Sequence, residues 1–316
     1  MSEPQHVLVT GANGFVGQAL VERLEEIDGH HVRAAVRTGR AMNCADSVTI
    51  GDINRDTDWS RALYGIDTVV HCAARVHVMN AADSEQSRAL FREVNVEGSR
   101  RLAEAAVQAG VRRLVFLSSI KVNGESTTGR PPFTADAPPA PEDAYGISKM
   151  EAERVLLEVA RLHGLELTIV RPPLVYGPGV KANFARLADA VARGTWLPLG
   201  AVDNRRSLVY LGNLVDLLSR CVRDQRAAGQ TFLVSDGEDL STSALIRCMA
   251  QARGRAPNLI PVPPSWMMSV ARLLGKQAVA DRLLGSLQVD IGPTCSKLDW
   301  TPPFSVLEGL RATFAT

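Results

Sequence analysis

The first half of the chain alternates short, apolar, β-branched runs with segments that have a helical pattern. Strands are predicted at residues 6–10, 31–37, 47–51, 67–71, 113–118 and 166–171. Helices are predicted between them at residues 15–26, 59–64, 84–110 and 145–163. Short strands that are apolar throughout are typical of a parallel sheet with helices on both faces. We therefore predict an α/β fold with a doubly wound (Rossmann) sheet, whose ligand site lies at the carboxyl ends of the strands.

The second half is less regular, and prolines interrupt it repeatedly. Residues 1–174 are interpreted as a nucleotide-binding domain to which residues 207–235 return. Residues 175–206 and 236–316 are interpreted as a smaller C-terminal α/β lobe that binds the substrate. Within this half, helices are predicted at residues 183–193, 211–224 and 241–253, and extended segments at residues 207–210 and 231–235.

Two segments leave alternatives open. Residues 124–143, rich in proline and acidic residues, form the longest segment expected to be flexible, either as a lid or as an ordinary surface loop. Residues 265–274 carry tryptophan, methionine and leucine at helical spacing. Such a pattern favours core or interface packing, and a membrane-contacting amphipathic helix is the alternative.

Composition narrows the class of protein. A net charge of +1 over 316 residues favours neither nucleic acid nor an acidic membrane surface as the main partner. The five cysteines show no CxxC spacing, which argues against a disulfide framework and a metal site. No uncharged apolar run approaches the ~20 residues that membrane insertion needs, and the first ten residues are too polar for a signal peptide. We therefore expect a reduced, cytoplasmic enzyme.

A glycine-rich turn follows the first predicted strand and opens the first predicted helix. Gly11 permits the tight turn, Gly14 lets the backbone approach a pyrophosphate, and Gly17 allows close helix–strand packing. The start of the helix then offers N–H groups to phosphates. The spacing is GxxGxxG, a variant of the dinucleotide fingerprint, and the cofactor contacts expected here also include Asn13, Phe15 and Val16.

The cofactor preference should be set at the end of the second strand, where an acid accepts from the ribose of NAD and a cation binds the 2′-phosphate of NADP. The chain has no acid there, and Arg37 and Arg40 are placed to clamp a phosphate. NADP(H) is therefore favoured, with NAD(H) as the alternative. Asp52 and Ile53 are expected beside the adenine, and Ala73 beside the adenosine ribose.

Tyr145 and Lys149 lie four residues apart and therefore on one face of a predicted helix. A tyrosine with a pKa of ~10 is a poor base at neutral pH. A nearby ammonium and the positive charge of an oxidised nicotinamide favour the phenolate, so Tyr145 becomes a credible acid and base. A serine hydroxyl at the end of the fifth strand, from Ser118 or Ser119, is placed to orient the reacting oxygen.

Together these motifs resemble the extended short-chain dehydrogenase/reductases, and specifically the UDP-glucose 4-epimerase-like enzymes of nucleotide sugars. The resemblance implies Ser119 as the catalytic hydroxyl, with Tyr145 and Lys149. Asn95, in the helix predicted at residues 84–110, matches an asparagine of the family. Pro172, in the segment RPPLVYGPG, is implied to lie where nicotinamide and sugar meet.

For the substrate, a UDP-sugar, the resemblance implies that Asn183 touches its phosphates and that Arg206 clamps its diphosphate. Ser119 and Tyr145 are implied to contact the sugar, and Lys121 is a further candidate with a solvated surface lysine as the alternative. A homodimer is also implied, formed by the helices at residues 84–110 and 145–163.

The residues after the catalytic serine separate the possible reactions. Sugar 4,6-dehydratases of the family carry an Asp-Glu pair there, whereas this chain has Ile120 and Lys121. A 4-reductase or a 4-epimerase remains. The missing acid near Arg37 favours a reductase of UDP-4-keto-6-deoxy-N-acetylhexosamines, making precursors of bacterial surface polysaccharide such as O-antigen. A UDP-hexose 4-epimerase is the alternative, and a reductase of apolar ketones and a non-catalytic NADP-sensing protein are the rivals.

Overall fold

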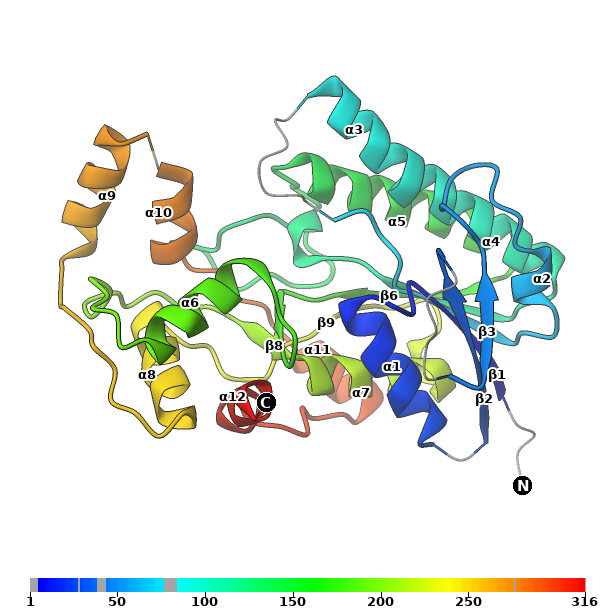
Figure 1. The fold of residues 1–316 in the computed structure, drawn as a ribbon. Helices are drawn as coiled ribbons and strands as arrows, with labels where there is room; N and C mark the ends of the chain where they lie inside the picture. Colours follow the sequence, from blue (N-terminus) through cyan, green and yellow to red (C-terminus); the bar gives the residue numbers. More distant parts are fainter. Residues whose placement is uncertain (1–4, 28, 39–43, 77–83, 276, 316) are drawn as a thin grey trace.

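A computed structural model describes residues 5–27, 29–38, 44–76, 84–275 and 277–315 (Figure 1). Its main sheet has seven strands in the order β3-β2-β1-β4-β5-β6-β9, and every neighbouring pair is parallel. The order reverses beside β1, which creates a crevice at the carboxyl ends of β1 and β4. The strands are β1 (Gln5–Thr10), β2 (His30–Val36), β3 (Asp46–Thr49), β4 (Thr68–His71), β5 (Arg113–Leu117), β6 (Glu166–Arg171) and β9 (Thr231–Leu233).

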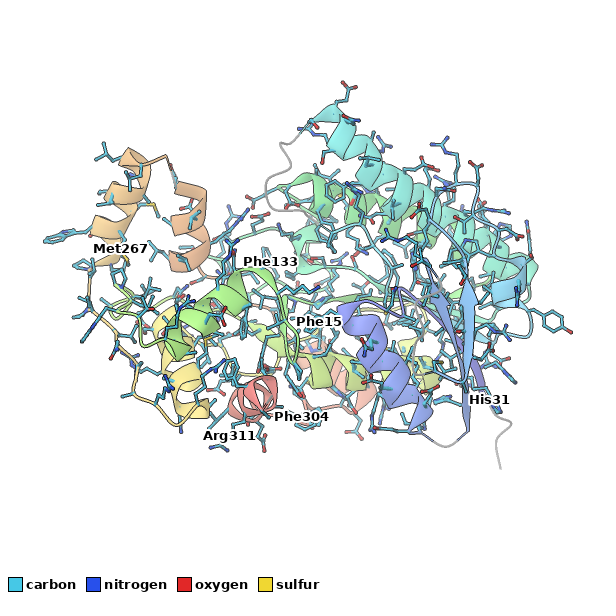
Figure 2. The ribbon with its side chains drawn as sticks, in the orientation of Figure 1. Phe15, His31, Phe133, Met267, Phe304 and Arg311 are labelled. Atoms are coloured by element: carbon cyan, nitrogen blue, oxygen red, sulfur yellow. The ribbon has the colours of Figure 1, made fainter. Side chains whose placement is uncertain are left out.

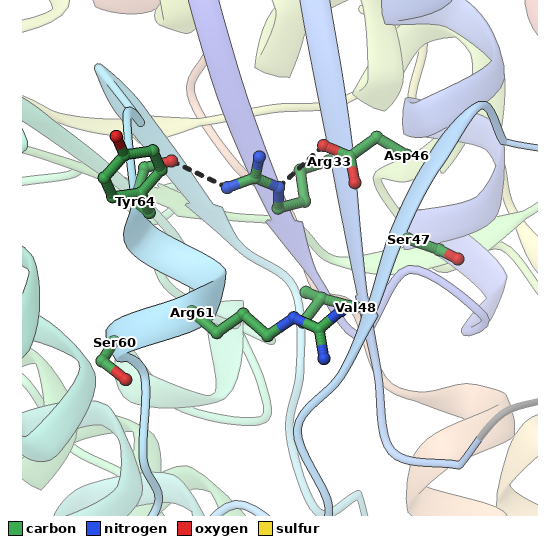
Figure 3. A pocket seen from close by; sticks show the side chains of 7 residues that line it. All are labelled: Arg33, Asp46, Ser47, Val48, Ser60, Arg61 and Tyr64. Atoms are coloured by element: carbon green, nitrogen blue, oxygen red, sulfur yellow. Dashed lines mark hydrogen bonds and ion pairs between the residues drawn. The ribbon is translucent and has the colours of Figure 1, made fainter.

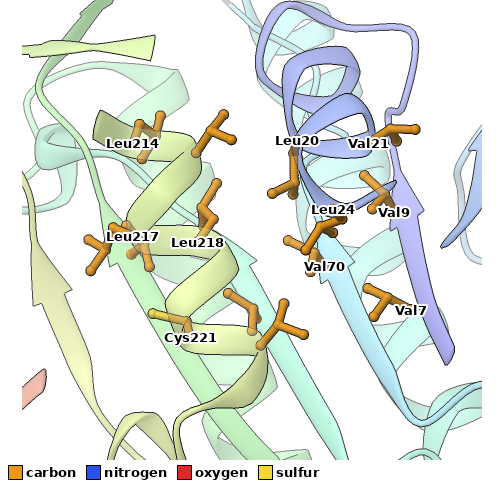
Figure 4. Packing of buried hydrophobic residues seen from close by; sticks show 14 of the residues in the cluster. Val7, Val9, Leu20, Val21, Leu24, Val70, Leu214, Leu217, Leu218 and Cys221 are labelled. Atoms are coloured by element: carbon orange, nitrogen blue, oxygen red, sulfur yellow. The ribbon is translucent and has the colours of Figure 1, made fainter. Parts of the chain in front are cut away.

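Both faces of this sheet are buried, which explains the continuous apolar strands. On β1, Val7 and Val9 belong to the core on one face, and Leu8 belongs to the core on the other. Helices α1 (Phe15–Glu25) and α7 (Leu211–Arg223) cover the first face (Figure 4). The second face is covered by α2 (Ser60–Leu63), α4 (Gly98–Gln108) and α5 (Ala144–His163).

The single helix predicted at residues 84–110 contains a π-helical turn. Its first part is α3 (Glu85–Arg92), capped by the Ser84 hydroxyl, and α4 follows the π turn Glu93–Glu97. A π turn is an insertion that opens the regular helical ladder, and such turns are frequent at functional sites. This one contains Asn95, which the family resemblance singles out.

The C-terminal region surrounds a small parallel sheet of β7 (Leu174–Tyr176) and β8 (Leu208–Tyr210). Asp236 joins these strands to α7, because its carboxylate accepts from the Tyr176 hydroxyl, the Tyr210 backbone N–H and the Asn213 amide. The remaining helices are α6 (Ala182–Ala192), α8 (Thr242–Ala252), α9 (Pro264–Leu273), α10 (Gln277–Leu284), α11 (Gly292–Leu298) and α12 (Val306–Phe314), with two 3-10 turns at Ile120–Val122 and Gln225–Ala227.

Residues 265–274 largely form α9, in which no residue is buried, although Met267 packs partly against the core of the C-terminal region. Interface packing of this helix stays a prediction. Not every proline in this region lies in a loop, because Pro264 is the first residue of α9.

The segment 124–143 is hydrogen-bonded to the chain that follows α10. The backbone N–H of Thr127 donates to Ser286, and that of Phe133 donates to Gln288.

Within the described residues, none of the helices combines the length and the apolar character that crossing a bilayer demands.

The main sheet and α5 are joined by a buried ion pair. Glu153 on α5 accepts from Arg171 Nε at 2.9 Å and Arg171 Nη2 at 2.6 Å, and the Ser118 hydroxyl donates to the same carboxylate at 2.5 Å. Both charged side chains are less than one-tenth exposed. Removing one partner would leave a buried charge without compensation.

We therefore expect Arg171→Met to lower the free energy of unfolding by about 3–5 kcal/mol, because Glu153 then loses both guanidinium bonds. Urea denaturation at neutral pH measures this change. The double variant Arg171→Met/Glu153→Gln should recover part of the loss, since the uncompensated charge is gone. Equal stability of the single variant and the wild type would contradict the expectation.

Candidate active site

The glycine turn has a geometry that side chains would obstruct. Gly11 has a φ of +66°, and a Cβ there would lie 2.7 Å from the backbone of Ala73. A Cβ on Gly17 would lie 2.2 Å from the carbonyl oxygen of Gly11. The first turn of α1 thus packs directly on the loop before it, as the fingerprint predicts.

The same turn presents open hydrogen-bond donors. Helix α1 begins at Phe15, and its N-cap Gly14 has no side chain to accept from the first N–H groups of the helix. Asn13, Gly14 and Phe15 are exposed, and Val16 is partly exposed. A dinucleotide pyrophosphate fits this cradle, because the residues of the turn are exposed and no N-cap side chain accepts from the first N–H groups of α1.

A hollow of about 790 Å³ lies beside this turn. It separates Asn13, Gly14 and Phe15 from Lys181, Tyr210 and Phe304 of the C-terminal region. In Figure 2, Phe15 and Phe304 mark its two sides. The glycine turn therefore faces the region that the sequence assigns to substrate binding.

The residues predicted for the adenosine end of the cofactor lie near one another. Arg37 Nη1 is 3.8 Å from the Asp52 carboxylate, and both side chains are mostly exposed. Ile53 packs against Gly98, where a Cβ would come within 2.5 Å of its Cγ2. The cation expected to bind a 2′-phosphate thus already has a carboxylate beside it. Arg40 lies outside the described residues.

Ser119, Tyr145 and Lys149 meet where β5 ends and α5 begins. The Ser119 side chain forms a hydrogen bond with the Tyr145 phenol. The Lys149 ammonium is buried, donates to the carbonyl oxygen of Leu117 at 2.8 Å, and lies 4.4 Å from the centre of the Phe116 ring. Both side chains of α5 are therefore directed toward the end of β5.

Burial determines how these two groups ionise. It raises the pKa of the Tyr145 phenol, the negative charge of Asp143 raises it further, and the hydrogen bond to Ser119 opposes both effects. Burial lowers the pKa of Lys149 to about 8, with the charge of Glu153 acting in the other direction. At neutral pH, with no cofactor bound, the phenol is therefore protonated and the lysine carries its charge. To act as a base the phenol must first lose this proton, which the positive charges of Lys149 and of an oxidised nicotinamide favour.

Ser118 and Ser119 have different environments. The Ser118 hydroxyl is buried and bonded to Glu153, so it belongs to the ion pair beneath the site. Ser119 caps the 3-10 turn Ile120–Val122 and is the serine that reaches the phenol. The catalytic role of Ser119 that the family resemblance implies stays a prediction.

A chain of hydrogen bonds links the glycine turn to the helix that carries Tyr145. Thr10, the last residue of β1, is 2.6 Å from His71 Nδ1, and His71 Nε2 is 3.0 Å from the Ser99 hydroxyl. Ser99 donates to the carbonyl oxygen of Asn95 within the π turn. The Asn95 amide then donates to Ser148, and the Ser148 hydroxyl donates to the carbonyl oxygen of Tyr145.

His71, Ser99 and Ser148 were not predicted as site residues. Burial lowers the pKa of His71 to about 3, so this ring stays neutral and positions its neighbours. Small polar residues inside apolar strands and helices are the only sequence signal for such a chain. Their partners are distant in the sequence and become visible only in the fold.

Lys121 has partners that the sequence analysis did not consider. Its ammonium donates to Glu125 Oε1 at 2.8 Å and also to Asp143. Asp143 in turn caps α5 by accepting from the Gly146 N–H at 2.7 Å. Lys121 is half-buried, so the solvated alternative is wrong, and its contacts support the start of the catalytic helix.

The predicted substrate residues occupy contrasting places. Arg206 is largely covered, and its Nη1 donates to the carbonyl oxygens of Arg282 at 2.8 Å and Gly285 at 3.1 Å. Among the described residues no carboxylate pairs with it, and burial lowers its pKa. Asn183 is exposed on the first turn of α6. Pro172 is buried, and its carbonyl oxygen accepts from the Ile120 N–H.

A second open pocket lies on a different part of the sheet (Figure 3). Arg33 and Asp46 form an ion pair there at 2.7 Å, and Arg33 also donates to the carbonyl oxygen of Tyr64. Asp46 is the first residue of β3, so this pocket lies toward the amino end of that strand. Ligands of doubly wound sheets bind at the opposite edge.

Comparisons with known proteins agree with this geometry. Residues 7–235 match the NAD dependent epimerase/dehydratase family. A UDP-glucose 4-epimerase of Vibrio cholerae is 46% identical over 98% of this chain and 94% of its own length. A 3-beta-hydroxysteroid dehydrogenase of Mycolicibacterium neoaurum is 32% identical over 80% and 72% of the two chains. The crystal structure of a UDP-glucuronic acid 4-epimerase from Bacillus cereus in complex with NAD has a TM-score of 0.77 at 20% identity, covering 98% and 96%.

Lys149→Met should not lower the free energy of unfolding at pH 7, despite the lost hydrogen bond to Leu117. With a pKa of about 8 in place of the ordinary 10.5, the folded wild type holds this proton less tightly than the unfolded chain does. Below pH 8 the charged lysine therefore costs the fold up to about 3 kcal/mol, and the cost fades as pH rises from 8 to 10.5.

Denaturant unfolding of both proteins at pH 7 and pH 9.5 measures the effect, because groups common to both cancel in the difference. The free energy of unfolding of the wild type should increase relative to that of the variant as the pH increases. If the difference in free energy of unfolding does not change with pH, or if the variant is several kcal/mol less stable at pH 7, then burial does not lower the pKa of Lys149 in the folded protein.

Asp52→Asn should raise the affinity for NADP relative to NAD, because it removes the carboxylate beside Arg37 and its repulsion of a 2′-phosphate. Fluorescence titration of the purified protein with each dinucleotide gives the ratio of dissociation constants. Asp56→Asn, a nearby exposed control, should leave the ratio unchanged. If Asp52→Asn also leaves it unchanged, the ion pair does not influence cofactor choice.

Proposed function

Because the chain belongs to the NAD dependent epimerase/dehydratase family, we propose that it is a 4-epimerase of a UDP-linked hexose, with NAD as its retained cofactor. The 46% identity to a UDP-glucose 4-epimerase, over nearly the full length of both proteins, supports this choice. It favours the epimerase, the alternative in the sequence analysis, over the 4-reductase.

The observation that carries the proposal is the single hydroxyl pair formed by Ser119 and Tyr145, with the buried Lys149 on the same helix face. Epimerisation at carbon 4 needs one group that takes a proton from the sugar oxygen and later returns it. A dehydratase needs a further acid and base next to the serine. Here Ile120 is buried and apolar, and Lys121 is paired with two carboxylates.

Bound NAD would supply a nicotinamide that accepts the hydride from carbon 4 and gives it back. The residues that would hold it are those of the glycine turn, with Ala73 beside Gly11 and Ile53 packed against Gly98. The pairing of Arg37 with Asp52 supports NAD, because a carboxylate near the ribose can accept from its hydroxyls and repels a 2′-phosphate.

The protein's own groups divide the remaining work. Tyr145 takes the proton of the 4-hydroxyl as that carbon is oxidised, and returns it when the ketone is reduced. Ser119 holds the same oxygen in place by hydrogen bonding. Lys149 keeps a positive charge near the phenol and stabilises its deprotonated form. Arg206, whose charge has no carboxylate partner among the described residues, binds the diphosphate of the substrate.

The 4-reductase of UDP-4-keto-6-deoxy-N-acetylhexosamines would use the same three catalytic residues with NADPH. The observation in its favour is Arg37 at the place of the acid that NAD enzymes carry. The carboxylate of Asp52 weakens that argument, since it already occupies the space beside the guanidinium.

A reductase of apolar ketones has support from the steroid dehydrogenase relative. Against it stands Arg206, a largely covered cation whose remaining donors suit a diphosphate better than an apolar ring.

We also propose that two copies pair through α4 and α5, because Leu157 and Leu162 of α5 are exposed.

We expect the purified protein to interconvert UDP-glucose and UDP-galactose without added cofactor. Tyr145→Phe should reduce kcat by about 10²–10⁴-fold, because the proton has no acceptor. Arg206→Met should mainly raise KM, because it removes diphosphate binding and leaves the reacting carbon untouched. Chromatographic separation of the two UDP-hexoses measures all three rates.

The competing functions predict different outcomes when turnover is measured with their own substrates. Stoichiometric loss of NADPH on a UDP-4-keto-6-deoxy-N-acetylhexosamine, with no interconversion of UDP-hexoses, would establish the reductase. Turnover of apolar ketones that is insensitive to Arg206→Met would establish the steroid-type enzyme. Equal activity of wild type and Tyr145→Phe would remove the catalytic assignment.

A further inference from the structure

Helices α9 and α10 form a hairpin at the end of the molecule opposite α2 and β3 (Figure 1). Its base is fastened by polar contacts to the last turn of α10. Asn204 donates to the carbonyl oxygens of Leu283 and Gly285, and Thr242 donates to Leu283. Met267 and Leu284 pack against the core of the C-terminal region and Ala280 is buried, whereas α9 has no buried residue.

The surface that the hairpin presents is apolar. Trp266 is 70% exposed and Leu273 is 86% exposed, and four further large apolar side chains of the two helices are also exposed, namely Val270, Leu274, Val279 and Leu283. Between the helices runs an open groove of about 390 Å³ whose lining residues are all apolar, including Met267 (Figure 2). A contiguous apolar surface of this kind marks an interaction site.

The hairpin also carries a net positive charge. Residues 264–284 contain two arginines and one lysine against a single acidic residue. Arg272 and Arg282 are exposed, and within the part of the chain that the structure describes neither pairs with a carboxylate. The local charge is therefore positive, although the chain as a whole is nearly neutral.

We propose that the α9–α10 hairpin docks reversibly on a lipid bilayer that contains anionic headgroups. A hairpin that exposes tryptophan, valine and leucine side chains and also carries exposed, unpaired arginines matches the layered chemistry of such a bilayer. The apolar residues enter the acyl region, the tryptophan ring lies at the interface, and the arginines meet the lipid phosphates. The inference goes beyond the proposed reaction and does not depend on it.

A second copy of the chain matches this surface less well. A two-fold interface places the same patch on both partners. Arg272 and Arg282 of one copy would then approach those of the other, and like charges in contact oppose association. Anionic lipid supplies both the apolar contact and the opposite charge.

The test is co-sedimentation of the full-length protein with phosphatidylcholine vesicles, with and without one third phosphatidylglycerol. Binding should be stronger on the anionic vesicles and should weaken as salt is added. Leu273→Asp/Leu274→Asp should reduce vesicle binding by roughly tenfold or more, because it places charges in the apolar contact. Tyr64→Asp, which changes an 81% exposed side chain at the other end of the molecule, is the matched control and should bind like wild type.

Fluorescence gives a second readout, because Trp59 and Trp300 are buried and Trp196 and Trp266 are exposed. Anionic vesicles should shift the emission to shorter wavelength, and Trp266→Phe should lose the shift while Trp196→Phe keeps it. UDP-hexose turnover of Leu273→Asp/Leu274→Asp in the absence of vesicles should equal that of wild type, which also shows that the variant is folded.

Two outcomes would overturn the proposal. One is equal vesicle binding by wild type and the double variant, or no binding by either. The other is a wild-type oligomer that ignores vesicles and dissociates in the double variant, which would make a second copy the occupant of the surface. If the protein proves not to be an epimerase, the vesicle-binding result still stands, so the failure of one proposal can be told from the failure of the other.

Discussion

The carboxylate of Glu153 is the interaction on which the arrangement of this site depends. It receives hydrogen bonds from Arg171 at the end of β6 and from Ser118 at the end of β5. Its negative charge also offsets part of the cost of burying the Lys149 ammonium one turn earlier on α5. One buried anion therefore fixes the ends of two strands and the helix that carries the acid–base residue. Two cations balance it, which is how a buried charge remains compatible with a stable core.

A second constraint couples the cofactor turn to the same helix. The close approach of Gly11 to Ala73 brings the ends of β1 and β4 together, and Thr10 and His71 begin the hydrogen-bonded chain there. The chain reaches α5 only because the π turn directs the Asn95 amide toward Ser148. A regular helix would place that amide elsewhere on its surface, so the irregularity is what joins the two halves of the site.

The sequence was most informative where local rules apply. The six predicted strands of the first half and their helices lie within about two residues of the observed ones, because apolar runs and glycine turns report local geometry directly. Motif order and strand ends predicted a serine hydroxyl near Tyr145, and only the family resemblance favoured Ser119 over Ser118. The proline-rich half was less predictable, since a proline begins a helix as readily as it ends one. There, β7, α10, α11 and α12 were missed.

The sequence by itself determined the parallel sheet, the glycine cradle and the pairing of phenol and ammonium on one helix face, because each depends on residues that are near one another along the chain. Only the tertiary structure decided which distant groups meet. It placed Asp52 beside Arg37, turned Lys121 toward the N-terminus of α5, and left Trp266, Val270 and Leu273 of α9 exposed. The physical reason is that charge pairing and burial depend on distances in space, which helical or strand periodicity does not encode.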